Sequence, residues 1–466
     1  MSGDLSGDLS GDLTRAPSAA VVAEAALPEA TALWRRLIAT PSPSTDAEAC
    51  TALAHQLVDL LRAGPAREVR LAEVAGHGPV VCATFEGTSQ DGPEYVFYQH
   101  YDVVQTDPAD WTHEPHAAVE ADGYLYGPGA CDDKADVAAR IAVLHQAWAA
   151  SALTSPPTCT IHLVLDGAEE VGSPGLGTAL DQLLPGARPE GVLWESYLRE
   201  TGGGAVVGLG SRGALELELT REEARKPIHP SYAAIVEDPV ADLLRVVAPL
   251  LGPYPAALLD RLQQQPVTPD RTALAQSGIQ LPWDEVGKSR AGHTQAQIDQ
   301  LTSDFIYTPR ITLASMPETA QVRTSIPSSA SLSLRVGIVP GLDVDEVQDA
   351  LTTLIHETDP RVHVRRVRAI PPAYTDPASS FVDHVREAWV AVRSSCVLYP
   401  LMTGAGPGHV FTERYGCPVA SPSGTLEPGG GIHVADERGS LELFAEHVRF
   451  TAELLERLHG ASPADR

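Results

Sequence analysis

Three segments decide the fold of this 466-residue chain: EYVFYQH at residues 94–100, ADVAARIAVLHQAWAAS at 135–151 and TCTIHLVLDG at 158–167. The first and last are short apolar runs with β-branched and aromatic residues, which predict buried strands. The middle segment has the length and the apolar period of a helix. Strand, helix and strand at this spacing predict an α/β layer built on a mostly parallel sheet.

The pattern of predicted strands and helices changes after residue 207 and returns to the α/β pattern after residue 372. The stretch between contains alternating strands and amphipathic helices, which predict a separate α+β module on an antiparallel sheet. We therefore expect a discontinuous α/β catalytic domain with an inserted lid and dimerisation domain. The expected boundaries are a disordered tail with an SGDL repeat at 1–19, the catalytic domain at 20–207 and 373–466, and the inserted domain at 208–372.

Composition excludes several classes of protein. A formal net charge of −28 argues against nucleic acid and against anionic membrane surfaces as partners, because both require a basic footprint. No apolar run approaches the ~20 residues of a membrane helix, and no signal peptide is recognisable. The six cysteines form no CxxC pair, so neither a disulfide framework nor a thiolate metal site is expected. These features predict a soluble cytoplasmic protein.

Polar residues gather where predicted strands end, which is where open α/β sheets place their sites. They are His100 and Asp102, Asp132 and Asp133, Glu169 and Glu170, Glu195, and, far downstream, His433. Imidazoles and carboxylates without thiolates suit a pair of borderline metal ions such as zinc or manganese. Two adjacent glutamates can supply both a metal ligand and a general base.

Each of these motifs also has a plain structural interpretation. The DDK at 132–134 suits a solvated turn, the EE at 169–170 suits the start of a helix, and a single histidine at 433 suits the surface. Their common order and their placement at strand ends favour the metal site over three unrelated polar turns.

At these residues the sequence resembles the dinuclear zinc metallopeptidase family of carnosinase-like dipeptidases, aminoacylases, succinyl-diaminopimelate desuccinylases and glutamate carboxypeptidases. The resemblance rests on HYD at 100–102, GPGACDDK at 127–134, AEEVGS at 168–173, LWES at 193–196 and GIHVADE at 431–437. It covers nearly all of the chain beyond the tail, and the first three motifs are highly specific as a set.

The resemblance implies roles for the first half of the site. His100 would be a ligand of one metal, and Asp102 the carboxylate that fixes the tautomer and orientation of that imidazole. Asp132 would bridge the two metals and would be joined to Asp133 by a cis peptide bond.

The resemblance also implies the remaining metal-site roles. Glu169 would be the general base toward a metal-bridging water, Glu170 and His433 would hold the second metal, and Glu195 would complete the first. Two divalent ions are implied; zinc is the expected metal, with manganese or cobalt as alternatives.

Two segments of the inserted domain and one glycine-rich stretch extend the resemblance. KPIHPSYAAIVEDP at 226–239 implies that His229 reaches into a partner subunit's active site and stabilises the oxyanion, which makes the protein a homodimer. SLSLRVGIVPG at 331–341 implies that Arg335 holds the substrate's carboxylate. TGAGPGH at 403–409, through Gly408, would present backbone N–H groups to the same carboxylate.

The sequence departs from the family pattern at several positions. It has DDKAD where glycine usually follows the lysine, and HPS where HSG is common. In the family, a glutamate at position 195 accompanies carboxypeptidases and deacylases, whereas the HYDVV and HPSYAAIVEDP segments resemble dipeptidases. The substrate signals therefore conflict.

The expected function is metal-dependent hydrolysis of an amide bond in a dipeptide or short peptide with a free carboxylate. The alternatives are an N-acyl amino acid deacylase, a carboxypeptidase, a non-catalytic metal- or peptide-binding homologue, and an enzyme that forms or transfers an amide.

Overall fold

The structure is a computed structural model that describes residues 18–89, 91–149, 157–196, 199, 204–253, 256–262, 281, 290–318, 324–427 and 430–460. The SGDL repeat and the rest of the predicted tail up to residue 17 lie outside these residues. The chain divides into two compact units. Unit 1 comprises Met1–Val207, Ala378–Val397 and Ala420–Arg466, and unit 2 comprises Gly208–Pro377 and Leu398–Val419.

Unit 1 is built around an eight-stranded sheet with the order β1-β2-β6-β3-β7-β17-β8-β15. In β3, every residue after Glu94 is buried, and β3 pairs in parallel with β6 and β7, whereas β1 and β2 add an antiparallel edge. The predicted α/β class with a mostly parallel sheet is confirmed. The strands are β1 (Glu68–Ala72), β2 (Gly78–Phe85), β3 (Glu94–His100), β6 (Thr160–Gly167), β7 (Gly191–Leu193), β8 (Ala205–Gly208), β15 (Cys396–Tyr399) and β17 (Val419–Pro422).

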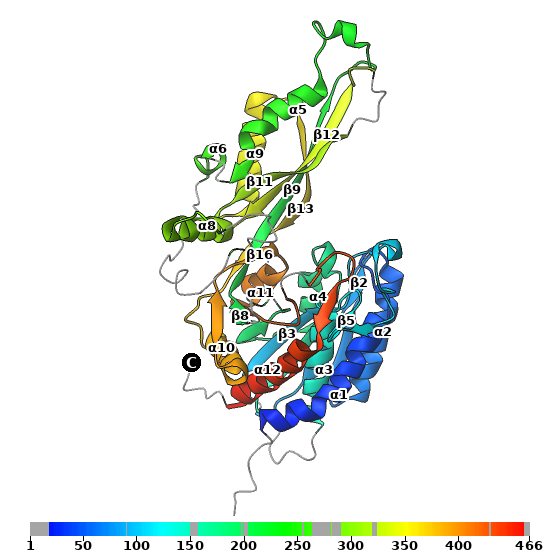
Figure 1. The fold of residues 1–466 in the computed structure, drawn as a ribbon, viewed down its shortest axis with the longest axis vertical. Coiled ribbons are helices and arrows are strands. Elements are labelled where there is room, and N and C mark those ends of the chain that lie inside the picture. The colour runs from blue at the N-terminus through cyan, green and yellow to red at the C-terminus, as the bar shows by residue number, and fades with distance from the viewer. Residues whose placement is uncertain are drawn as a thin grey trace, which may run out of the picture. The chain divides into compact units, whose positions relative to one another are not determined.

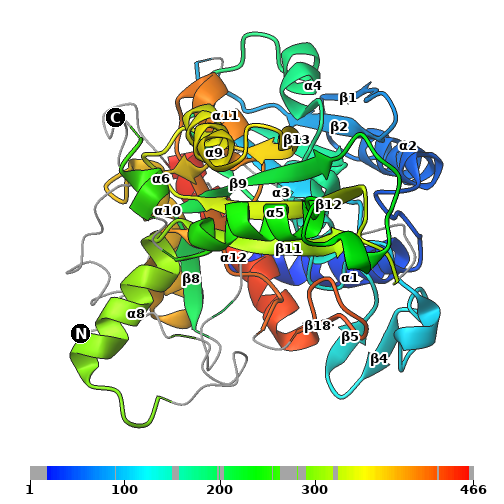
Figure 2. The same cartoon turned by 90° about the horizontal axis from the view of Figure 1, so that it is seen from above.

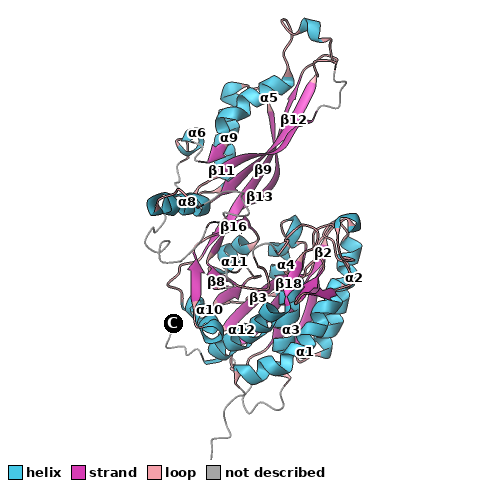
Figure 3. Cartoon of the chain, in the orientation of Figure 1, coloured by secondary structure: helices cyan, strands magenta, loops and turns pink. Residues whose placement is uncertain are grey.

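The helices of unit 1 cover this sheet. Helices α1, α3 and α12 pack against one another, and α10 packs on α12 (Figures 1 and 3). Helix α2 lies beside β1 and β2 (Figure 2). None of the described helices has both the length and the apolar composition required to cross a membrane. The helices are α1 (Ala19–Ile38), α2 (Ala47–Ala63), α3 (Lys134–Trp148), α4 (Leu176–Leu183), α10 (Ser380–Arg393) and α12 (Leu441–Gly460).

A small three-stranded sheet of unit 1 joins segments that are far apart in the sequence. It has the order β18-β5-β4, formed by β4 (Val119–Ala121), β5 (Tyr124–Tyr126) and β18 (Arg438–Ser440). Because Arg438 pairs with Tyr126, the residues just before β18 lie beside the residues just after β5. This pairing brings the 431–437 segment next to the 127–133 segment.

Unit 2 has the antiparallel sheet that its alternating sequence predicts. Its central path is β10-β11-β12-β9-β13, and β14 and β16 also pair with β9. The inward residues of β9, such as Leu215 and Leu217, are fully buried against leucines of β12 and apolar residues of α5 and α9. The strands are β9 (Gly210–Glu222), β10 (Gly252–Pro253), β11 (Arg310–Glu318), β12 (Ser329–Ile338), β13 (His363–Ile370), β14 (Ala373–Tyr374) and β16 (Met402–Ala405). The helices are α5 (Pro239–Val247), α6 (Ala256–Leu259), α8 (Gln295–Tyr307), α9 (Val344–Thr358) and α11 (Gly408–Tyr415).

The division of the chain differs from the predicted boundaries in one segment. The structure divides between residues 207 and 208 and between 377 and 378, close to the expected positions. Residues 398–419, which the sequence analysis assigned to the catalytic domain, group with unit 2. The reason is that β16 pairs with β9, a contact between segments almost 200 residues apart.

Candidate metal centre

The carboxyl end of β3 fixes the position of His100. The residue after it, Tyr101, is fully buried, and its Oη donates a hydrogen bond of 2.6 Å to the carbonyl oxygen of Pro79 on β2. Gly167 leaves room for this ring, because a Cβ atom there would lie 2.2 Å from Tyr101 Oη. Tyr101 therefore anchors the chain at the point where β3 ends and the site begins.

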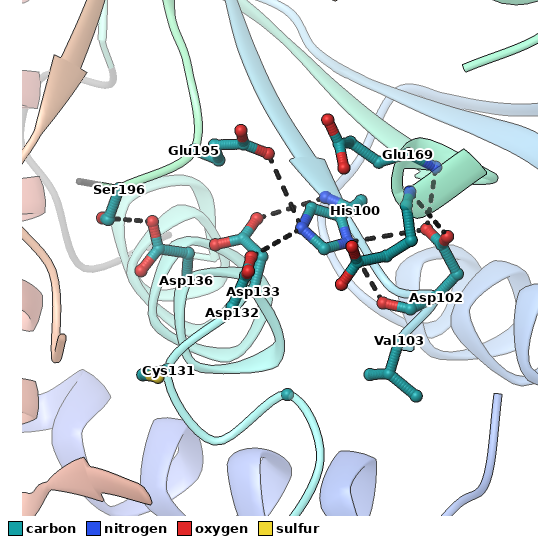
Figure 4. Close-up of polar contacts among 12 residues, drawn as sticks. His100, Asp102, Val103, Cys131, Asp132, Asp133, Asp136, Glu169, Glu195 and Ser196 are labelled. Carbon is teal, nitrogen blue, oxygen red and sulfur yellow. Dashed lines mark hydrogen bonds and ion pairs between the residues drawn. The ribbon is translucent and has the colours of Figure 1, made fainter. Parts of the chain in front are cut away.

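Asp102 is a buried acceptor for several groups of the site. The Nδ1 atom of His100 lies 3.0 Å from the main-chain oxygen of Asp102 and 3.5 Å from its carboxylate. The carboxylate accepts the N–H groups of Glu169 and Glu170, each at 3.1 Å, and the hydroxyl of Ser44 at 2.7 Å. Asp102 therefore orients the imidazole and also holds the main chain of both glutamates. Figure 4 shows Asp102 beside His100 and Glu169.

The Asp132 carboxylate lies between two imidazoles. Its Oδ1 is 3.0 Å from His100 Nε2, and its Oδ2 is 3.2 Å from His433 Nε2. The peptide bond between Asp132 and Asp133 is cis, which confirms that expectation. Asp133 accepts the main-chain N–H of His100 at 3.1 Å. One oxygen toward each imidazole is the arrangement that a carboxylate bridging two metals requires.

The remaining predicted ligands face the same region. His433 Nε2 lies 2.9 Å from Glu170 Oε2, and Glu195 Oε2 lies 3.6 Å from His100 Nε2. Glu195 Oε2 is buried and has no hydrogen-bond partner among the described residues. The short 3₁₀ helix η2 (Glu169–Val171) carries Glu169 and Glu170 directly after β6. Figure 4 shows Asp132 and Glu195 facing the same side of the His100 ring.

Within the described residues, two groups of side chains have the geometry to hold a metal ion. One consists of His100, Asp133 and Glu195, and the other of His100, Asp132 and Glu170. In each group the ligand atoms lie within 4.8 Å of one another. Asp133 is not among the ligands predicted from the sequence. Carboxylate and imidazole donors without thiolate suit zinc or manganese, so the residues present fit a pair of divalent ions.

The protonation equilibria of the site reflect its crowded negative charge. Burial raises the pKa of Glu169 and of Glu195 well above the ordinary range, and the charge of Glu195 raises the pKa of Glu169 further. Burial opposes protonation of His100, but its hydrogen bonds to Asp102 and Asp132 outweigh burial and raise its pKa well above the usual value. Hydrogen bonds to Asp132 and Glu170 raise the pKa of His433 to about 10. Protons bound to these groups thus neutralise part of the negative charge of the carboxylates, which bound divalent cations would otherwise neutralise.

Glu437 supports the site and was missed by the sequence analysis. Its buried carboxylate accepts the N–H groups of Gly129, Cys131 and Asp132 at 3.0, 2.9 and 3.2 Å. Burial and the nearby charge of Asp132 raise the pKa of Glu437 to about 7. The sequence feature that could have indicated Glu437 is its position four residues after His433. The pairing of β18 with β5 brings this segment next to the Asp132 segment.

Lys134 is a second structural support. Its ammonium group is fully buried and donates to the carbonyl oxygens of Leu37 and Thr40 at 2.9 and 2.8 Å. These bonds tie the start of α3, directly after the two aspartates, to the end of α1. The lysine of the DDK motif therefore has a structural role rather than that of a solvated turn residue.

The three other predicted site residues belong to unit 2, whereas all predicted metal ligands belong to unit 1. His229 is exposed at the start of η3 (Pro230–Tyr232), where its Nδ1 accepts the N–H of Ser231 at 3.2 Å. Arg335 is exposed on β12, and Gly408 is buried as the first residue of α11. Their roles toward a substrate stay predictions.

Known proteins share sequence and fold with this chain. The model of a family described as peptidase family M20/M25/M40 matches residues 96–457. A cysteinylglycine-S-conjugate dipeptidase of Corynebacterium striatum is 29% identical over 165 residues, and a succinyl-diaminopimelate desuccinylase of Paracoccus denitrificans is 31% identical over 167 residues. Each match covers 34% of this chain, and the chain spans only 34% and 41% of the lengths of these two relatives.

A solved structure extends the similarity over nearly the whole chain. An M20 family metallo-carboxypeptidase from Sulfolobus solfataricus superposes with a TM-score of 0.82 and 20% sequence identity, covering 93% of this chain and 100% of the other. At this identity the similarity concerns the fold.

Proposed function

The chain belongs to the M20/M25/M40 peptidase family, and from that premise we propose that it is a dinuclear metal-dependent hydrolase that cleaves an amide bond in a small substrate. The observation that carries the proposal is the position of Asp132, whose two oxygens lie 3.0 and 3.2 Å from the Nε2 atoms of His100 and His433. Glu195 and Glu170 extend the donor set on either side.

We assign the metal ligands as His100, Asp132 and Glu195 for one ion and Asp132, Glu170 and His433 for the other. Zinc is the expected metal, and manganese or cobalt would accept the same donors. Two divalent ions held by these residues would acidify a bound water and polarise the scissile carbonyl.

Glu169 is the proposed general base. It takes a proton from the attacking water and later delivers it to the leaving amine. Its position supports this role, because its main-chain N–H is bound to Asp102, as is that of the proposed ligand Glu170. One acceptor thus fixes the spacing between the base and a metal ligand.

The substrate is a dipeptide or short peptide with a free carboxylate, which Arg335 and the backbone at Gly408 would bind. Glu195 favours a second candidate, because the family resemblance associates a glutamate there with carboxypeptidases and deacylases. Parallel assays on a free-amine dipeptide and its N-acetylated counterpart separate the two. Preferential cleavage of the free-amine substrate supports the dipeptidase, and the reverse supports the deacylase.

Metal analysis and a base variant test the proposal. The purified protein should contain two divalent ions, and a chelator should abolish hydrolysis. Glu169→Gln should lower kcat by about 10²–10⁴-fold while metal content is unchanged. Glu68→Gln, at an exposed carboxylate of β1, is the control and should be neutral. Full turnover by Glu169→Gln, or activity that survives metal removal, would overturn the assignment.

We further propose a homodimer in which His229 acts in the partner's site and stabilises the oxyanion. The test mixes Glu169→Gln with His229→Ala after separate purification and subunit exchange. If His229 acts in trans, the mixed dimer contains one intact site and activity returns. If mixed dimers form and activity stays at the level of the two variants, His229 does not act in trans.

A further inference from the structure

The DDKAD segment ends in a carboxylate that the proposed mechanism does not use. Asp136 lies in the first turn of α3, and its side chain is fully buried together with that of Arg140 one turn later. The Oδ2 atom of Asp136 accepts hydrogen bonds from Arg140 Nη2 at 3.2 Å and from the hydroxyl of Ser196. Ser196 directly follows the proposed ligand Glu195 (Figure 4).

Arg140 binds the same segment from its other side. Its Nη2 donates to the carbonyl oxygen of Trp194 at 2.7 Å, and its Nη1 donates to that of Leu193 at 3.2 Å. Nη1 also donates to the carbonyl oxygen of Tyr98 on β3 at 3.2 Å. The guanidinium thus binds the two residues before Glu195, while Asp136 binds the residue after it.

The surrounding residues leave little room for the segment to move. A Cβ atom at Gly424 would lie 2.4 Å from Ser196 Cβ, so the serine reaches Asp136 through a gap that only glycine provides. Ser421 donates its hydroxyl to the carbonyl oxygen of Glu195. By contrast, the Oε2 atom of the Glu195 side chain makes no hydrogen bond within the described part of the chain. This ligand is therefore held through the main chain of residues 193–195 and the side chain of Ser196, and not through hydrogen bonds of its own Oε2 atom.

We propose that Asp136 and Arg140 are positioning residues for Glu195, an inference that rests on the metal centre of the proposed function. Both lie on α3, whose start directly follows Asp132 and Asp133. One helix thereby sets the distance between the bridging carboxylate and Glu195. A purely structural ion pair would need no contacts to three residues that flank a ligand on both sides.

The test compares metal affinity rather than activity alone. Zn²⁺ is titrated in competition with a chromogenic chelator into metal-free wild type, Asp136→Asn and Ser196→Ala. Asp136→Asn keeps the shape of the side chain but removes its charge. Both variants should weaken one of two bound ions by about 10–100-fold, the range for residues that orient metal ligands. The other ion should bind as in the wild type.

Two further variants make the result interpretable. Glu29→Gln, on α1, removes the negative charge that lies 2.8 Å from His145 of α3, and it should leave both affinities unchanged. Glu195→Gln should weaken the same single ion as Asp136→Asn. If Glu195→Gln weakens neither ion, the metal centre of the proposed function is wrong.

If Glu195→Gln weakens one ion but Asp136→Asn and Ser196→Ala bind both ions as the wild type does, only the positioning role is wrong. If Asp136→Asn does not fold, Ser196→Ala decides alone, because its hydroxyl lies at the partly exposed end of the network. Equal loss of affinity in Glu29→Gln would also overturn the inference, because any disturbance of α3 would then have the same effect.

Discussion

Replacing Asp102 by asparagine tests how the site holds its base and ligand. The Asp102 carboxylate is fully buried and accepts three hydrogen bonds, from the N–H groups of Glu169 and Glu170 and from the Ser44 hydroxyl. Asparagine has one oxygen, so its NH₂ group must face at least one of these donors. A buried donor left without an acceptor costs about 1–3 kcal/mol.

The lost charge adds to this cost. Hydrogen bonds to a charged acceptor contribute about 1.5–3 kcal/mol, against about 0.5–1.5 kcal/mol for a neutral one, so two retained bonds lose roughly 2 kcal/mol. Together we expect Asp102→Asn to lower the free energy of unfolding of the metal-loaded protein by about 3–5 kcal/mol. Metal-free protein should lose less, because the variant also removes one of several crowded negative charges.

The assay is urea unfolding with Zn²⁺ and with chelator, together with a Zn²⁺ titration. Asp46→Asn is a matched control: Asp46 also accepts two main-chain N–H groups, at Glu48 and Ala49, but at the exposed start of α2. Asparagine and aspartate cap helices equally well, so the control should be near neutral. If the free energy of unfolding of Asp102→Asn is within about 0.5 kcal/mol of the wild-type value, and the variant binds metal equally tightly, hydrogen bonding by this carboxylate does not hold the site.

Two predictions concern the rest of the molecule. Arg221 is buried, and its Nε atom lies 3.1 Å from Asp359 Oδ2, so Arg221→Met should lower the free energy of unfolding by roughly 3 kcal/mol. The control Arg365→Met removes an exposed arginine and should lower it by at most about 1 kcal/mol. Equal losses of the two variants in urea unfolding would contradict this expectation. Burial lowers the pKa of His447 from 6.5 to about 4, so the unfolded chain takes up a proton that the folded protein excludes as pH falls. Stability should therefore drop by roughly 3 kcal/mol between those pH values through this group, and His447→Gln, compared by urea unfolding across the range, should lack that part of the slope.

The parts of the fold that could be predicted are those set by local pattern. The continuous apolar run at 94–100 has no alternation, because β3 is covered on both faces, and this identified a strand inside a parallel sheet. The assignment of residues 398–419 required pairing between β16 and β9, which no local pattern contains. A glycine-rich stretch shows where the chain turns, but it does not show which strand the chain will pair with.

In the candidate site, the ligands could be predicted from the sequence, whereas the residues that support them could not. A ligand must be an imidazole or a carboxylate at a strand end, so residue type and position together indicated His100, Glu170 and Glu195. A support such as Glu437 is recognised only by the main-chain N–H groups that it accepts, and every residue except proline has one. Its partners become known only when the β18–β5 pairing is known.

The DDKAD segment at 132–136, which departs from the family pattern, contains a further supporting residue. Where the family usually has glycine after the lysine, this chain has alanine, and the next residue is Asp136. A carboxylate at that position would be costly in a buried helix without partners. Here it meets Arg140 on its own helix and Ser196 beside Glu195. The sequence shows the unusual residue, but its partner Ser196 is 60 positions away. The hydrogen bond between them forms only because Gly424 has no side chain and lets the serine approach. A departure from a family motif is therefore best interpreted together with the distant residue that compensates it, and here that residue adjoins a proposed metal ligand.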